Sequence, residues 1–311
     1  MNIRPLNERD LPEARRIVRL AFGTFLGAPD PENFLSDMDY VTSRWRADAK
    51  AAFACEVDGK LVGSNFATCW GSVGFFGPLT VHPEYWNKGI AQQLMQPVME
   101  CFDNWKLTHA GLFTFAESPK HIALYQKYGF YPRFLTAILS KSVAERPKDQ
   151  QWETFSKLTP AYRDAVVQAC FRLTDSLYPG LDLAREILAV DTQHLGDTVL
   201  LRKGSQLFGF AVCHTGPGTE AGNNKCYIKF GAALPGSESA HHFDMLVAAC
   251  EEFATSAGMT EVEAGMNLAR HEAYRSLIAR GFRMGRSGVA MHRPLDPGYS
   301  RPGIYVIDDW R

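Results

Sequence analysis

The residues best suited to chemistry lie between Phe76 and Leu94, where an apolar run ends at Val81 and a proline-containing turn follows. After the turn, Lys88-Gly89-Ile90-Ala91 opens a segment whose apolar residues recur every four positions, which predicts a helix with one buried face. The first N–H groups of a helix have no partner within it and lie at the positive end of its dipole. The stretch therefore predicts a strand, a turn and a helix N-terminus that can bind an anion such as phosphate.

Strand and helix patterns surround this stretch on both sides. Residues 2–6 can form a strand, and Asn7 can cap a helix whose apolar, buried face runs from Leu11 to Phe22. Two β-rich runs around Asp58-Gly59 predict a hairpin, and a third run covers residues 72–81. Later segments predict a strand at 111–116, a short helix at 119–128 that ends at Gly129, and a strand at 134–139.

The second part of the chain repeats this order of elements after a polar segment, residues 142–151, that we interpret as a linker. A helix pattern near the start is followed by a hairpin pattern that turns at residues 203–205, then by strand, helix, strand and short helix. The pairs Gly129-Phe130 and Gly281-Phe282 are 152 residues apart, and Phe76-Gly77 and Phe230-Gly231 are 154 apart. These similar offsets predict a duplicated unit of about 150 residues.

Composition excludes several classes of function. Thirty-three Lys and Arg residues oppose 34 Asp and Glu residues, so the basic excess that nucleic-acid binding requires is missing. Seven cysteines without paired spacing predict reduced thiols, and the neighbours His241 and His242 point in different directions on a helix, so no metal site is expected. A charged N-terminus and the lack of a long apolar run predict no membrane association and a cytoplasmic location.

The order of these elements, with two motifs, resembles the GNAT superfamily of N-acetyltransferases. The cofactor motif of that family, R/Q-x-x-G-x-G/A, reads Trp86-Asn87-Lys88-Gly89-Ile90-Ala91, and a later motif reads Ser118 followed by Leu124-Tyr125-Gln126-Lys127-Tyr128-Gly129-Phe130. The resemblance covers residues 1 to about 140. It implies an α+β fold with two GNAT-like domains in tandem, each a mixed, mostly antiparallel sheet flanked by helices. The expected ranges are a catalytic domain at 1–141, a linker at 142–151, a degenerate domain at 152–295 and a tail at 296–311.

The resemblance implies acetyl-CoA as the cosubstrate. In this family a splayed strand, here Leu79, Thr80 and Val81, pairs with the pantetheine arm through its backbone. The pyrophosphate then rests on the N–H groups of Asn87, Lys88, Gly89, Ile90, Ala91 and Gln92, and Ser118 belongs to the same cofactor site. Trp86 stands where the family has Arg or Gln. Because the cradle consists of main-chain donors, we expect weaker affinity or an altered loop rather than loss of the site.

The resemblance also assigns a catalytic acid. Tyr125 matches the family tyrosine that donates a proton to the departing thiolate, and a phenol with a pKa near ~10 is protonated at neutral pH. The base that takes the proton from the ammonium is open. Glu117, at the end of the strand at 111–116, is one candidate; a water chain is another, and His82 and His121 follow.

The C-terminal copy lacks this chemistry. Its counterpart to the opening stretch, Phe230 to Phe243, has no x-x-G-x-G/A pattern, and Leu277 occupies the place of Tyr125. We interpret it as a degenerate domain that supports the first and walls the acceptor pocket. The tail after Pro294 contains an apolar run, residues 304–307, and is expected to pack back on the body.

The charge of one segment of the sequence gives an indication of the acceptor substrate. From Leu20 to Ser43 there is no Lys or Arg, but four acids occur: Asp30, Glu32, Asp37 and Asp39. If they border the acceptor site, they favour a small cationic amine. We therefore expect an N-acetyltransferase that acts on a primary amine by direct transfer, since no cysteine lies in either motif, as a monomer or homodimer. A non-catalytic acyl-CoA sensor and a purely structural tandem protein are the alternatives.

Overall fold

The computed structural model describes residues 1–144, 152–204 and 206–311, so residues 145–151 of the expected linker lie outside the described part. The first half contains β1 (Asn2–Pro5), α1 (Leu11–Phe25), α2 (Tyr40–Ala47), β2 (Ala52–Val57), β3 (Lys60–Trp70), β4 (Val73–Phe76), β5 (Thr80–Val81), α3 (Ile90–Asn104), β6 (His109–Thr114), α4 (Pro119–Gln126) and β7 (Tyr131–Ser142). The second half contains β8 (Glu153–Thr154), α5 (Pro160–Leu177), α6 (Ala184–Gln193), β9 (Gly196–Lys203), β10 (Gln206–Thr215), β11 (Lys225–Ala233), α7 (Ser239–Ser256), β12 (Glu261–Asn267), α8 (His271–Ala279), β13 (Arg283–Arg293) and β14 (Val306–Ile307).

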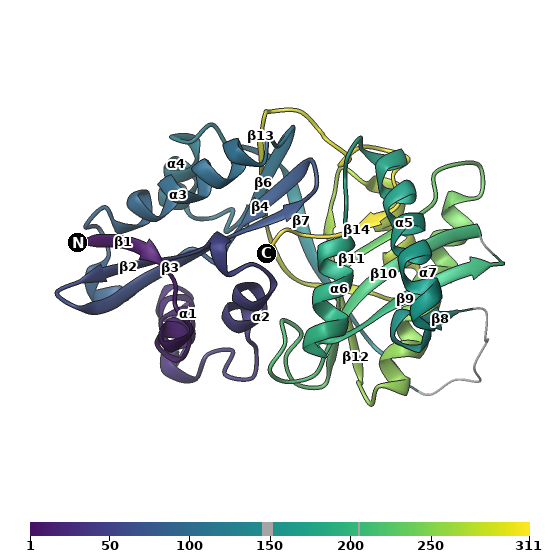
Figure 1. The fold of residues 1–311 in the computed structure, drawn as a ribbon, viewed down its shortest axis with the longest axis horizontal. Coiled ribbons are helices and arrows are strands. Elements are labelled where there is room, and N and C mark those ends of the chain that lie inside the picture. The colour runs from purple at the N-terminus through teal and green to yellow at the C-terminus, as the bar shows by residue number, and fades with distance from the viewer. Residues whose placement is uncertain (145–151, 205) are drawn as a thin grey trace.

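The two halves lie side by side and share one path of paired strands (Figure 1). The strand order is β1-β2-β3-β4-β6-β13-β7-β12-β11-β10-β9-β8, with β5 paired to β3 and β14 paired to β11. Among the described strands, β4 with β6 and β11 with β12 run parallel, and the other ladders are antiparallel. The mixed, mostly antiparallel α+β fold expected from the sequence is thus confirmed.

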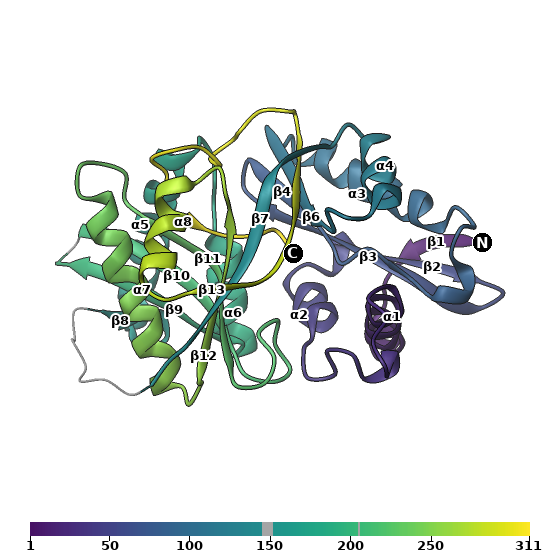
Figure 2. The ribbon, with the colours of Figure 1, turned by 180° about the vertical axis from the view of Figure 1, so that it is seen from behind.

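The halves exchange strands where they meet. β13, from the second half, lies between β6 and β7 of the first, and Figure 2 shows β7 and β13 running together along the junction. Val289 of β13 is opposite Thr114 of β6, whereas Ser287 of β13 is opposite Ala137 of β7. β7 in turn pairs with β12. Each repeat therefore ends in a strand that extends the sheet of the other, while the sequence ranges given above for the domains stay a prediction.

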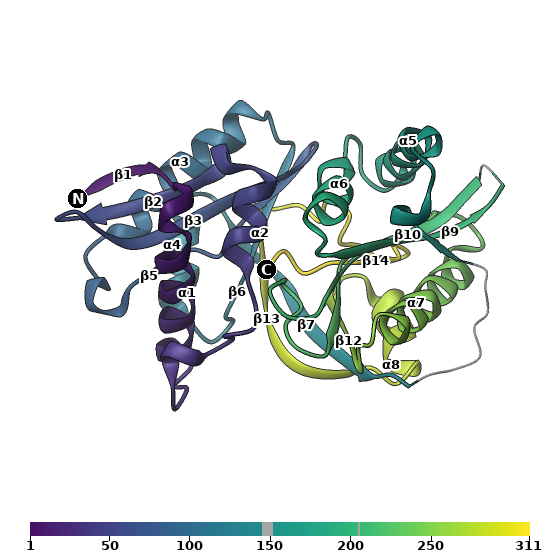
Figure 3. The ribbon, with the colours of Figure 1, turned by 60° about the horizontal axis from the view of Figure 1, so that its bottom comes forward.

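Helices cover both faces of each half, because apolar residues alternate along the strands. Phe66 of β3 packs with Val18 of α1 and Val41 of α2, whereas its neighbour Ala67 packs with Val98 of α3. In the second half, α5 and α6 pack in one apolar cluster and α7 and α8 in another, and Figure 3 shows the two pairs apart. Among the described helices, none is both long and apolar enough to cross a membrane.

The junction combines an apolar core with buried charges. Trp70 of β3 packs edge-on against Phe230 of β11, with ring centroids 5.4 Å apart. The tail returns as expected: β14 pairs with β11, and the chain end lies between the two halves in Figure 1. The packing of Trp310 depends on Gly111 of β6, because a Cβ at Gly111 would lie 2.0 Å from the indole ring. The tail therefore reaches the first half through a space that a larger side chain would fill.

Candidate active site

A cavity of about 840 Å³ opens where β4 and β6 diverge. The parallel ladder between these strands ends at Phe75 opposite Gly111. The chain then turns at Gly77-Pro78, so the single strand expected at residues 72–81 is divided into β4 and β5. After the turn, β5 pairs with β3 and not with β6. Both edges of the opening, residues 79–81 and 112–114, line the cavity. The strand splay implied by the resemblance is present.

The strand edge at residues 79–81 carries a buried hydroxyl group on a wall of the cavity. Thr80 lines the cavity and is buried, and its hydroxyl group has no hydrogen-bond partner among the described residues. Leu79 and Val81 flank it on the same wall. Because a buried polar atom without a partner is unfavourable, the edge suits a ligand with amide groups, such as a pantetheine arm. The three strand residues predicted from the sequence therefore lie where an extended ligand can reach them.

The N-terminus of α3 lines the same cavity. Gly89 precedes the helix with a φ of +78°, a left-handed conformation that favours glycine, and no side chain caps the helix. Gly89 accepts a hydrogen bond from Gln93, so the N–H groups of Ile90, Ala91 and Gln92 have no partner from the preceding turn. These residues and Asn87 line the cavity. The helix N-terminus thus presents main-chain donors at the cavity, and their binding of an anion stays a prediction.

Three other residues of the motifs are Trp86, Lys88 and Ser118, and the structure shows what each contacts or where it lies. The indole N–H of Trp86 donates to the carbonyl of Val81 at 2.7 Å and ties the loop to the strand, so its replacement of Arg or Gln leaves the main-chain donors in place. Lys88 and Ser118 are not among the lining residues: the Lys88 ammonium lies 4.7 Å from the Tyr85 ring centroid, and Ser118 precedes α4. Their contact with the cosubstrate stays a prediction.

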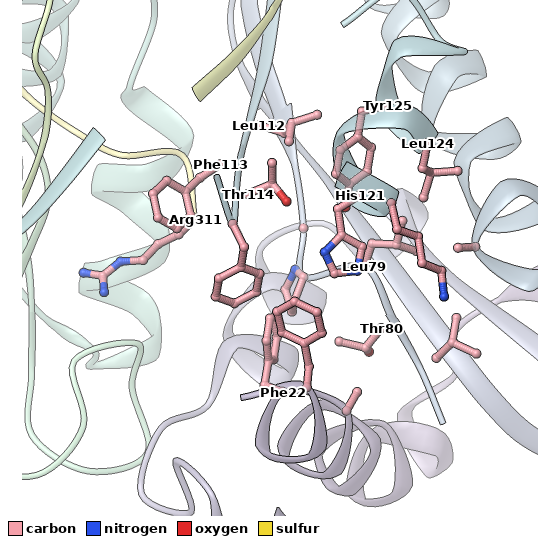
Figure 4. Close-up of a pocket in the computed structure, with 18 of the residues that line it drawn as sticks. Phe22, Leu79, Thr80, Leu112, Phe113, Thr114, His121, Leu124, Tyr125 and Arg311 are labelled. Carbon is pink, nitrogen blue, oxygen red and sulfur yellow. The ribbon is translucent and has the colours of Figure 1, made fainter. Parts of the chain in front are cut away.

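Helix α4 places two ionisable groups on one face. His121 and Tyr125 are four residues apart and both line the cavity, and in Figure 4 they project from α4 near Leu79 and Thr114. Burial raises the pKa of Tyr125, so its phenol is protonated at neutral pH, as an acid requires. Burial, with Lys120 beside it, lowers the pKa of His121, so its imidazole is neutral. Glu117 also lines the cavity, with an exposed side chain.

Beyond α4 the cavity is aromatic. The rings of Phe25 and Phe115 lie 4.9 Å apart, His121 lies 4.9 Å from Phe25, and Phe22 lies 6.1 Å from Phe115. Sequence periodicity assigned Phe22 to the buried face of α1, but it is half-buried and lines the cavity. No local signal separates a phenylalanine at a cavity wall from one in a core, because both lie on apolar faces.

The four carboxylates expected to border the acceptor site form ion pairs or hydrogen bonds outside the cavity, so that expectation is wrong. Asp39 caps α2 and pairs with Arg15, and Glu32 pairs with Arg16. Asp30 accepts from Asn33, and Asp37 from the backbone N–H of Asn223 in the second half. None of these four acids is among the lining residues. The segment instead contributes Phe34, Leu35 and Tyr40 to the wall.

The second half closes the far end of the cavity. Arg286 and Ser287 of the exchanged strand β13, with Trp310 and Arg311 of the tail, line the wall there. The Arg311 guanidinium group points away from the cavity in Figure 4 and pairs with Glu263 and Asp309. The corresponding position to Tyr125 in the second half, Leu277, is buried in an apolar cluster. The expected supporting role of this half therefore includes a wall of the site.

Comparison with known proteins finds a family model that matches part of the chain. Residues 15–130 match the model of the acetyltransferase (GNAT) family. A protein from Pyrococcus horikoshii assigned as an acetyltransferase is 15% identical over 99% of this chain and 94% of that chain, with a TM-score of 0.69. A GCN5-related N-acetyltransferase from Sphaerobacter thermophilus is 14% identical over 94% of both chains, with a TM-score of 0.58.

A third solved structure has two such domains. The tandem GNAT protein from the clavulanic acid biosynthesis pathway is 14% identical over 94% of this chain and 97% of that chain, with a TM-score of 0.56. At these identities the likeness shows the fold alone. A search of curated proteins finds no match to this sequence.

Proposed function

Because residues 15–130 form a domain of the acetyltransferase (GNAT) family, we propose that the protein is an N-acyltransferase that moves the acetyl group of acetyl-CoA to a primary amine. One observation carries the proposal: the splayed strand edge, the N-terminus of α3 and Tyr125 all line a single cavity. When bound, acetyl-CoA supplies the acetyl group as a thioester. No cysteine lies among the described residues that line the cavity, which supports direct transfer in a ternary complex.

The residues of the first half have distinct roles in this reaction. The free N–H groups of Ile90, Ala91 and Gln92 bind the pyrophosphate, and residues 79–81 orient the pantetheine arm. The Tyr125 hydroxyl gives its proton to the sulfur as the thioester bond breaks and the new amide bond forms. Its raised pKa keeps that proton in place until the transfer.

Two side chains can take the proton that the amine loses. Glu117 was proposed from the sequence, and it lies at the exposed end of the lining. His121 is a second candidate that the structure supports, because it lies one helical turn from Tyr125 and its pKa is lowered by burial. A water chain stays open as a third route. The cationic acceptor expected from the acidic segment has lost its support, and the proposal keeps the amine without that charge.

Three measurements on the whole chain test the function. Calorimetry with acetyl-CoA should show binding, and a panel of primary amines should then include acceptors that release CoA thiol. Binding without thiol release on any amine would indicate an acyl-CoA sensor instead. A melting temperature that acetyl-CoA does not raise would indicate a structural protein, since a ligand that binds only the native state must stabilise it.

A further inference from the structure

The lining of the cavity has a composition that bears on the acceptor. Its walls include Phe22, Phe25, Phe34 and Phe115 from the first half and Trp310 from the tail. Glu117 is the single carboxylate side chain among the described residues that line the cavity, whereas Lys120, Lys127 and Arg286 are cations that form no ion pair with the described residues. This is the reverse of the charge balance that a diamine or polyamine would need.

We infer that the acceptor is a primary amine carried on an apolar, ring-sized body that also bears an anionic group, which Arg286 binds. The inference rests on the proposed function, since it assigns the acceptor of that same site. It makes Arg286 a residue that determines specificity, and not a member of the catalytic machinery.

The apolar part of the inference follows from the aromatic walls. Phe25 contacts both Phe115 and His121, with ring centroids 4.9 Å from each. An apolar ring gains from leaving water for such a site, and aromatic pairs prefer these tilted, offset arrangements. A small polycation would lose its hydration water on entering this site, and Glu117 is the one carboxylate side chain among the described lining residues that could compensate its charge.

The anionic part follows from Arg286. Its side chain is exposed, lines the cavity and makes no ion pair or hydrogen bond with the described residues. Arg311, in contrast, is already paired with Glu263 and Asp309. Arg286 precedes by three positions Val289, which lies opposite Thr114 on the β6 edge of the cavity. Three strand residues span about 10 Å, so Arg286 lies about that far along β13 from the position opposite Thr114. A small molecule can span this distance.

Cosubstrate phosphates do not account for Arg286. The anion cradle is at the N-terminus of α3, with Lys120 donating to Asn87 beside it at 2.6 Å. Arg286 lies on β13, on the side of β6 away from β4, next to Ile138, its partner in the β7–β13 ladder. The two candidate anion sites therefore serve different ligands.

The test compares matched acceptors in the thiol-release assay on the whole chain. The probes are 2-phenylethylamine, phenylalanine and the dipeptide Phe-Gly, which place a ring and an anion at different distances from the amine, with putrescine as the dication. We expect the ring-bearing anionic probes to exceed 2-phenylethylamine in kcat/KM, and putrescine to be the poorest. Arg286→Gln should lower kcat/KM for the anionic probes about 10- to 100-fold, the effect of losing a charged hydrogen bond, and leave 2-phenylethylamine and the KM for acetyl-CoA unchanged.

Arg283→Gln is the matched control, because Arg283 is exposed on the same strand but does not line the cavity. It should leave all four values unchanged. Putrescine as the best acceptor, or an equal loss for all probes in Arg286→Gln, would overturn the inference while leaving the proposed function in place. Thiol release with none of the amines, despite calorimetric binding of acetyl-CoA, would overturn both.

Discussion

Arg44 of α2 and Glu220 of the second half form a buried ion pair: Nε of Arg44 lies 2.9 Å from Oε1 of Glu220, and the side chains are 4% and 0% exposed. Arg44 also donates to the carbonyl of Gly77 at 2.6 Å, at the turn where the cleft begins. Lys229 shares Glu220 and continues the network to Glu186. One guanidinium group thus links the second half to the turn at the edge of the cleft.

Arg44→Ala should reduce the free energy of unfolding by about 3–5 kcal/mol, because it leaves a buried carboxylate with one partner fewer. Urea denaturation of the whole chain measures the change. Arg185→Ala is the control: Arg185 pairs with Asp48 but its side chain is 67% exposed, so the loss should be about 0–1 kcal/mol. Equal small losses in both variants would contradict the role assigned to Arg44.

Gly89→Ala should weaken acetyl-CoA binding. Alanine disfavours the left-handed backbone at this position by about 1–2 kcal/mol, so the loop would shift away from the conformation that presents the α3 N–H groups. Gly59→Ala in the β2–β3 turn is a matched control, because Gly59 has nearly the same φ, +76° against +78°, far from the cavity lining. Calorimetry should show reduced affinity in the first variant alone; equal affinity in both would remove Gly89 from the cradle.

Tyr125→Phe should lower kcat about 10²- to 10⁴-fold, the usual contribution of a positioned acid, with acetyl-CoA binding retained. Steady-state thiol release at saturating acceptor measures the change. Tyr274→Phe on α8, the counterpart of α4 in the second half, should keep full activity. Unchanged thioester cleavage in Tyr125→Phe would show that another group protonates the sulfur.

The pH dependence of kcat/KM distinguishes the two candidate bases. With His121 as the base, the rate falls on the acidic side as the imidazole becomes protonated, and His121→Gln lowers the rate and removes that limb. Glu117→Gln would then have a small effect. His82→Gln is the control, because His82 does not line the cavity. If Glu117→Gln alone alters the profile, the carboxylate is the base, and if neither variant does, a water chain takes the proton.

Acid should destabilise the protein through two buried histidines. Burial, with Lys229 nearby, lowers the pKa of His214 to about 4, and burial, with His109 nearby, lowers the pKa of His292 to about 3. Above pH ~6.5 both residues are neutral folded and unfolded; below it the unfolded chain binds protons that the native state excludes. Stability should therefore fall from pH ~6.5 to ~4, by up to about 1.4 kcal/mol per pH unit for each histidine.

Urea denaturation at pH 7, 6 and 5 measures this slope. His214→Gln should make it shallower, because one of the two groups is gone. A free energy of unfolding that does not change between pH 7 and 5 would show that these histidines bind protons equally in both states.

Sequence patterns were sufficient for features set by neighbouring residues. The Asp58-Gly59 hairpin and the duplicated order of elements are present in the structure. Asn7 caps a short 3-10 turn, Glu8–Asp10, and not α1 itself, which begins at Leu11. The anion cradle was predictable because it depends on the local backbone around Gly89. The hydrogen bond from Trp86 to Val81 is also local, since the two residues are five positions apart. It was not predicted, because it depends on the conformation of the loop between them.

Features that depend on distant pairing were not predictable. The edges of β6 and β12 carry similar apolar patterns, so nothing in either stretch indicates that β13 pairs with β6 and β7 with β12. The prediction that the acidic segment borders the acceptor site failed for the same reason. The partners of its carboxylates, such as Arg15 and the backbone of Asn223, come from other parts of the chain. Trp310 and Arg286 join the cavity wall only when both halves are assembled.

The strand exchange also sets an order in time. During synthesis, β6 is complete at Thr114, but its partner β13 begins at Arg283, about 170 residues later. At about 5–20 residues per second, the β6 edge waits roughly 10 to 30 s for that partner. An unpaired strand edge can pair with another chain, so newly made first halves are exposed to association with one another during this interval. The half that carries most of the candidate site therefore gains its last strand only when the second half is nearly complete.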